Sequence, residues 1–173
     1  FSIQDEEAAL AAMAQSLGPA LTAYHFPEEA LQITRLMQEL PPTEPEGRPT
    51  PGMQPEAAVS AVLGVDMDDL TAAVLRHWGL HERLLAAARP LSRSNPVRKP
   101  VTREETLRTV ASLAHELAAT VLLEAEKQPA AVHLVYTRYT RALDLTPKEC
   151  IQNLELATRL VDGRRRPEPV NPA

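Results

Sequence analysis

The side chains that could bind a metal ion or transfer a proton are few and scattered along this sequence. Of its five histidines, only His77 and His81 have the four-residue spacing that places two ligands on one face of a helix. Gly79 lies between them and is expected to end a helix after Trp78, which would break that geometry. We therefore expect packing or surface roles for the histidines, including the three that stand apart: His25, His115 and His133.

An acidic cluster, Asp66, Asp68 and Asp69, could in principle bind calcium or magnesium. An EF-hand loop needs further oxygens and a glycine at fixed spacing, whereas here an apolar run begins at once with Leu70. The cluster is better explained by a helix N-cap at Asp66, with the other carboxylates near the positive end of the helix dipole. Cys150, the only cysteine, has no catalytic partner nearby in sequence, so we expect a buried packing role.

Two stretches of the sequence carry a family resemblance. In the first, Leu17-Gly18 is followed by Tyr24-His25-Phe26-Pro27-Glu28; in the second, Leu63-Gly64-Val65-Asp66 leads to Trp78-Gly79-Leu80. These segments resemble the "Leu-Gly", "Tyr-x-Pro-Glu" and "Trp-x-Leu-Pro" stretches of HDOD domains, which are non-catalytic relatives of the HD and HD-GYP metal-dependent phosphohydrolases. The resemblance covers most of residues 5–160 and corresponds to the C-terminal portion of that domain. One departure is His81, which stands where the family usually has proline.

The resemblance implies that the hydrolytic centre is missing. Catalytic relatives carry a His-Asp pair just before the first Leu-Gly step, because a divalent metal needs an imidazole and a carboxylate to bind it and acidify its water. This chain has Gln15 and Ser16 at those positions. A neutral amide and a hydroxyl bring no anionic charge to a metal, so we expect no catalytic residue, no metal and no cofactor. Gln15 and Ser16 are expected simply to end a helix.

The composition predicts an all-α fold. Hydrophobic residues make up 44% of the chain but include only six aromatic residues, so the core must be mostly Ala, Leu and Val. The resemblance implies an HD-like orthogonal bundle, and we expect about seven helices and no sheet. Helix starts are signalled by prolines before glutamates, at Pro27 and Pro55, and by two capping boxes of the Ser/Thr-x-x-Glu type, at Thr102 and Thr146.

Apolar periodicity after the first capping box predicts three helices. The longest starts at Thr102 and ends near Lys127, the next covers residues 132–143, and the last stops at Gly163.

The domain organisation is expected to be simple. Residues 1–162 are predicted to form one helical domain, which the first residue, Phe1 rather than Met, suggests is part of something longer. Residues 41–55 contain six prolines and are expected to form a flexible loop, and residues 90–100 an irregular connection. Residues 163–173 are expected to be a disordered tail.

Composition also limits where in the cell the protein is expected and what it is expected to bind. A single cysteine, no apolar run of membrane-spanning length and no signal-peptide pattern favour a soluble, cytoplasmic protein. Up to Asp69 there are 12 acidic and 2 basic residues, and after it 11 acidic and 16 basic. Because the basic residues are scattered and not interleaved with aromatic ones, a solvated surface explains this asymmetry better than a nucleic-acid site does.

The resemblance to HDOD domains implies a regulatory module of a bacterial signalling protein, which acts through contacts with a protein partner or an attached domain. HDOD domains also have an upstream helical half, which has no counterpart in this sequence. Self-association is therefore also expected, because apolar surface that this half covers would be left open. Trp78 and His81 are the candidate interaction residues, although a core position is favoured for Trp78. The main alternative is a degenerate phosphohydrolase that still binds a nucleotide or metal. Nucleic-acid binding is least favoured; it would use the basic residues Arg89, Arg93, Arg98, Lys99, Arg103 and Arg108.

Overall fold

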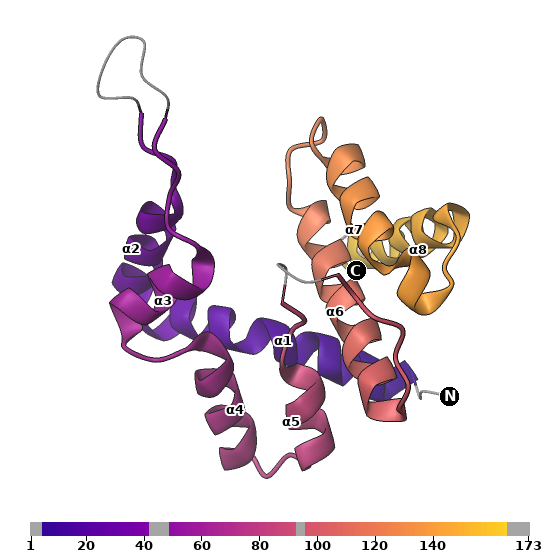
Figure 1. Ribbon diagram of the computed structural model, residues 1–173, viewed down its shortest axis with the longest axis horizontal. Helices are drawn as coiled ribbons and strands as arrows, with labels where there is room; N and C mark the ends of the chain where they lie inside the picture. The colour runs from indigo at the N-terminus through magenta and orange to yellow at the C-terminus, as the bar shows by residue number, and fades with distance from the viewer. Residues whose placement is uncertain (1–4, 42–48, 93–95, 166–173) are drawn as a thin grey trace, which may run out of the picture.

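The architecture of the described residues is helical. The computed structural model describes residues 5–41, 49–92 and 96–165, which form eight helices and no strand apart from one isolated bridge (Figure 1). The all-α prediction is confirmed, with eight helices in the described part where about seven were expected. None of these helices is long and apolar enough to span a bilayer. The helices are α1 (Asp5–His25), α2 (Pro27–Met37), α3 (Pro55–Leu63), α4 (Met67–His77), α5 (Glu82–Ala88), α6 (Arg103–Val121), α7 (Gln128–Leu143) and α8 (Pro147–Arg165).

The predicted helix starts are confirmed at atomic level. The Thr102 hydroxyl accepts a hydrogen bond from the Glu105 amide at 3.1 Å, and the Glu105 carboxylate accepts one from the Thr102 amide at 3.2 Å. Thr146 and Glu149 repeat this exchange at 3.3 and 2.8 Å. Amide donors stabilise the ionised carboxylate. The amides of Val101 and Thr102 therefore lower the pKa of Glu105, and the Thr146 amide lowers that of Glu149.

The first helix does not end where the sequence suggested. α1 continues through Leu17, Gly18 and Pro19 to His25, so the expectation that Gln15 and Ser16 end a helix is wrong. Proline normally interrupts a helix because it lacks an amide donor and crowds the preceding turn. Here buried residues lie on both sides of it, Gln15 before and Thr22 after. Tertiary packing on both sides therefore favours the helix across the local break.

Three other helix ends differ from the prediction. α6 ends at Val121 rather than near Lys127. The side-chain Nε2 of Gln128 donates to the backbone carbonyls of Val121 and Leu123, at 3.3 and 3.0 Å. This side chain satisfies carbonyls at the end of α6, and α7 begins at the same residue, before the predicted 132. At the other end of the chain, α8 passes through Gly163 to Arg165. Residues 163–165 of the predicted tail are therefore helical, and residues 166–173 lie outside the described part.

The proline-rich segment was predicted to be a loop throughout, but part of it is held by backbone hydrogen bonds. Leu40 and Thr50 exchange two backbone hydrogen bonds, and the Met53 amide donates to the Leu36 carbonyl at 2.8 Å. At Gly52 an added Cβ would lie 2.2 Å from the Met37 carbonyl oxygen, so only glycine fits against the end of α2 there. The residues on both sides of the loop thus pack against α2. Residues 42–48 lie outside the described part, so the predicted flexibility is not tested for them.

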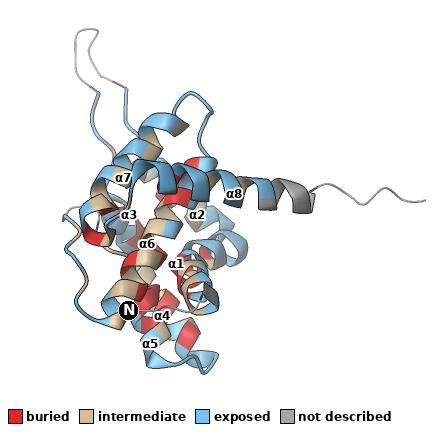
Figure 2. Ribbon diagram, turned by 90° about the vertical axis from the view of Figure 1, so that its right-hand side faces the viewer, coloured by how far each residue is buried: buried red, intermediate tan, exposed pale blue. Residues whose placement is uncertain are grey.

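The core lies where α1 crosses α5 and α6. Figure 1 shows α1 running across the middle of the molecule, with α2 and α3 at one end and α6 at the other, and Figure 2 shows the buried residues along it. Small side chains let the three helices approach closely. One cluster joins α1, α5 and α6 through Ala11, Ala87, Leu107 and Ala111, and a second joins α1, α4 and α5 through Ala14, Leu75, Leu85 and Ala88.

Gly18 sets the approach of α4 to α1. A Cβ at this position would lie 2.4 Å from Thr71 Oγ1 and 2.8 Å from Met67 Sδ, both on α4. Real Cβ atoms do not approach other atoms that closely, so the Thr71 and Met67 side chains, or α4 itself, must shift if the glycine gains a side chain.

The substitution Gly18→Ala tests this contact. In an open helix, alanine stabilises by about 1 kcal/mol relative to glycine. Here the overlap with α4 reverses the sign, and the free energy of unfolding should fall by about 1–3 kcal/mol in urea denaturation. The exposed Ala23→Gly reports the propensity effect alone on the same helix. An unchanged or more stable Gly18→Ala variant would show that α1 and α4 are not held this close.

Candidate functional site

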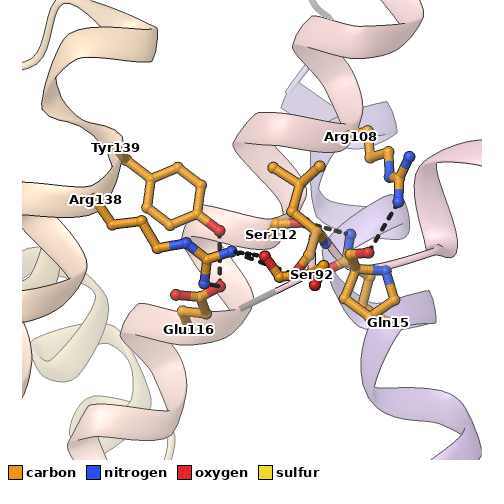
Figure 3. A network of polar contacts seen from close by, with 9 residues as sticks. Gln15, Ser92, Arg108, Ser112, Glu116, Arg138 and Tyr139 are labelled. Carbon is orange, nitrogen blue, oxygen red and sulfur yellow. Dashed lines mark hydrogen bonds and ion pairs between the residues drawn. The ribbon is translucent and has the colours of Figure 1, made fainter. Parts of the chain in front are cut away.

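Gln15 is a buried structural amide. Its side chain is 4% exposed, and Nε2 donates to the Ala87 carbonyl of α5 at 2.8 Å and to Ser112 Oγ of α6 at 3.1 Å (Figure 3). Ser112 Oγ also accepts a hydrogen bond from the Leu91 amide at 3.1 Å. Since a carbonyl can only accept, its contact with Nε2 fixes the orientation of the amide. Gln15 therefore joins α1, α5, α6 and the segment that follows α5.

Ser16 also makes a contact between helices, on the exposed side of α1. Its Oγ lies 2.9 Å from Nδ1 of His115 on α6. His115 and its neighbour Glu116 face different partners, as their adjacency on a helix predicts. Among the residues that the structure describes, no group of three or more histidine, cysteine, aspartate or glutamate side chains is placed to hold a metal. Both residues at the expected His-Asp positions thus take part in helix packing.

A mostly buried ion pair extends this polar junction toward α7. Arg138 of α7 lies 2.7 Å from the Glu116 carboxylate of α6, which also accepts a hydrogen bond from the Tyr139 hydroxyl at 2.8 Å (Figure 3). The same guanidinium donates to the Ser92 carbonyl at 2.6 Å. Over 20 residues separate these partners in sequence, so no local pattern predicted the pair. Arg108 of α6 holds the same segment through the carbonyls of Arg89 and Pro90, at 2.7 and 2.9 Å.

The three aspartates of the acidic cluster have different surroundings. Asp66 precedes α4 as predicted, but its side chain makes no capping hydrogen bond. Asp69 forms an ion pair with Arg89 at 2.8 Å. Partial burial raises the pKa of Asp68, against the opposing effect of the nearby Arg89 and Arg108 guanidinium groups.

Cys150 and His81 are both explained by local structure. Cys150 is buried, as predicted, and burial raises the pKa of its thiol, which keeps it protonated near neutral pH. His81 caps α5, with Nδ1 accepting a hydrogen bond from the Arg83 amide at 3.2 Å. Gly79, at φ +74°, ends the preceding helix turn as predicted and separates His77 from His81.

Trp78 is not a core residue, and the expectation that it packs inside is wrong. Its side chain is 57% exposed, because α4 ends at His77 and Gly79 turns the chain toward α5. Trp78 instead lies at the edge of a cavity of about 330 Å³ between the end of α1 and one face of α4. We call this cavity the Trp78 groove; it is lined by Leu21, Thr22, His25, Phe26, Leu70, Val74, His77 and Trp78.

The groove exists because α4 is apolar on two faces. One face, with Thr71, Ala72 and Leu75, is buried against the core. The other carries Leu70, Val74 and Trp78 at four-residue intervals, and the first two are only half-buried. The four-residue spacing was visible in the sequence, but only the fold shows that the first face fills the core and leaves the second one open.

A second cavity, of about 410 Å³, lies between α7 and α8. Its lining is mostly apolar and includes the protonated Cys150 thiol, together with His133, Tyr136 and Glu155. In the described part of the chain, no hydrogen bond or ion pair joins these groups to one another. They therefore form no catalytic pair or triad.

Comparison with known proteins adds no relative. No protein-family model, no curated protein and no solved structure matches this chain. The resemblance to HDOD domains therefore stays a prediction.

Two substitutions of Gln15 test its structural role. Gln15→Leu leaves the buried Ala87 carbonyl without its donor and should lower the free energy of unfolding by about 1–3 kcal/mol. Gln15→Glu should cost more, because an ionised carboxylate cannot donate to that carbonyl and carries a buried charge. Burial raises the pKa of such a carboxyl in the folded state, so stability should fall further as the pH rises from 5 to 8.

Urea denaturation at both pH values measures these effects. Met13→Glu, at an exposed position of the same helix, is the matched control and should change stability by less than about 0.5 kcal/mol. Equal stability of Gln15→Glu and Met13→Glu at pH 8 would contradict a buried structural amide.

Proposed function

We propose that this chain is a non-catalytic regulatory module that acts through protein contacts, and that the Trp78 groove is its contact surface. The observation that carries the proposal is the second apolar stripe of α4, which ends at an exposed tryptophan. A helix packed in a globular protein normally needs one apolar stripe. The open stripe is therefore surplus to the fold and available to a partner.

The aromatic residues at the groove strengthen the proposal. Trp78 and Phe26 are each more than half exposed, and the Leu21 and Leu70 side chains are half-buried within the groove. Tryptophan is strongly enriched among residues that dominate binding energy at protein interfaces, since it buries a large area with few rotatable bonds. A cleft formed by two helices with apolar side chains at helical spacing suits a third helix.

The wider context follows from the resemblance to HDOD domains. It supports a module of a bacterial signalling protein, located in the cytoplasm and joined to, or recruited by, another signalling domain. Self-association is a second proposal, supported by apolar side chains exposed away from the groove, such as Leu122 and Leu156. Sedimentation at increasing concentration tests it, and a strictly monomeric species would contradict it.

Selection of helical peptides against the whole chain tests the groove. Trp78 is the only tryptophan, so its fluorescence reports occupancy of the groove directly when the peptides contain none. Selected peptides should shift Trp78 emission to shorter wavelength in a saturable manner. Leu70→Asn should weaken them by about tenfold or more, because it places an amide in the apolar lining.

Leu134→Asn is the matched control, since Leu134 is 71% exposed and lies on α7, outside the groove lining. It should leave peptide affinity unchanged. Peptides that bind without perturbing Trp78, or that bind the Leu70→Asn variant equally well, would contradict the proposed contact surface.

The absence of catalysis is also a proposal. A degenerate phosphohydrolase would still bind manganese or a nucleotide through clustered histidine and carboxylate side chains. Calorimetric titration of the chain with manganese and with nucleoside phosphates should give no binding heat, because Gln15 and Ser16 are engaged with α5 and α6. Saturable heat, or cleavage of a phosphoester, would favour the degenerate enzyme instead.

A further inference from the structure

The helices that form the Trp78 groove are strongly depleted in basic residues. α1 contains no lysine or arginine, and α2 and α4 contain one arginine each, Arg35 and Arg76. Arg76 lies 3.7 Å from the Glu82 carboxylate, so its charge is already partly balanced. The two histidines in the lining, His25 and His77, are the other basic side chains there.

Carboxylates flank the groove-lining residues in the sequence. Asp66 lies one helical turn before Leu70, in line with the open stripe of α4. Glu28 and Glu29 occupy the first turn of α2, directly after Phe26. Within the described part of the chain, none of these three side chains forms an ion pair or accepts a hydrogen bond.

We propose that the occupant of the Trp78 groove is a basic amphipathic helix of a partner protein. This inference rests on the proposed function and adds the chemistry of the partner. The open stripe from Leu70 to Trp78 covers nine residues, or about 12 Å of helix, which matches about two turns of a partner. Leucine-like side chains of the partner fill the groove, and flanking lysine or arginine side chains face the free carboxylates.

The charges mainly determine which helix binds, and they contribute less to how tightly it binds. Complementary charge accelerates association and disfavours partners with the same sign of charge, whereas the buried apolar area supplies most of the affinity. An acidic helix of equal apolar content would place its carboxylates beside Asp66, Glu28 and Glu29. It should therefore bind more weakly despite filling the groove equally well.

Two designed peptides separate these possibilities. Both repeat leucine at helical spacing and lack tryptophan; one has lysine and the other glutamate at the polar positions. Titrated into the whole chain, the Leu/Lys peptide should shift Trp78 emission at about tenfold or more lower concentration than the Leu/Glu peptide. Raising the salt concentration should narrow this difference, because exposed charges are screened.

Charge variants show whether the preference for the Leu/Lys peptide comes from the carboxylates near the groove or from the net negative charge of the chain. Neutralising the flanking carboxylates, with Glu28→Gln, Glu29→Gln and Asp66→Asn together, should remove most of the preference for the Leu/Lys peptide. The matched control neutralises three exposed carboxylates on other elements, with Glu124→Gln, Glu126→Gln and Glu155→Gln, and changes the net charge equally. That control should retain the preference.

Each alternative outcome is informative. Equal affinity for the two peptides, or equal loss in both triple variants, would overturn the basic-helix inference. If the peptides selected against the groove shift Trp78 but are acidic or uncharged, or prove to match a helix of this same chain, the contact surface holds and the basic partner is wrong. If no peptide of either charge perturbs Trp78, both proposals fail.

Discussion

The buried amide of Gln15 is the contact on which the rest of this structure depends. It lies at the point where α1 crosses α5 and α6, in a core made largely of alanine and leucine. Small side chains bring helices close but give little directional preference, whereas a buried donor must find its acceptor in one geometry. The bonds to Ala87 and Ser112 therefore select one crossing of three helices, and the bond from Leu91 to Ser112 adds the segment after α5.

The position of α4 follows from that crossing. α1 remains helical beyond Pro19, and Gly18 allows α4 to pack directly against it. With the core face of α4 fixed by Leu75 and its neighbours, the face with Leu70, Val74 and Trp78 lies beside the end of α1 and stays partly exposed. The groove and its aromatic edge are thus a geometric consequence of how the core is built.

Several polar residues that could have served in catalysis or metal binding make structural contacts instead. Ser16 meets His115, Glu116 pairs with Arg138, and Asp69 pairs with Arg89. Each pairing occupies a group that a catalytic or metal site would need to keep available. Asp66, Glu28 and Glu29, by contrast, make no such pairing within the described part of the chain, which agrees with the proposed contact surface.

The sequence by itself determined the helical class, the capping boxes at Thr102 and Thr146, the start of α2 at Pro27 and the turn at Gly79, because these depend on residues within one helical turn of each other. It also predicted burial of Cys150. Only the tertiary structure decided that α1 continues past Gly18, that Trp78 is exposed, and that Gln15 is a buried junction. Those outcomes depend on contacts between residues as far as 97 positions apart, and neither composition nor periodicity specifies which face of a helix meets which neighbour.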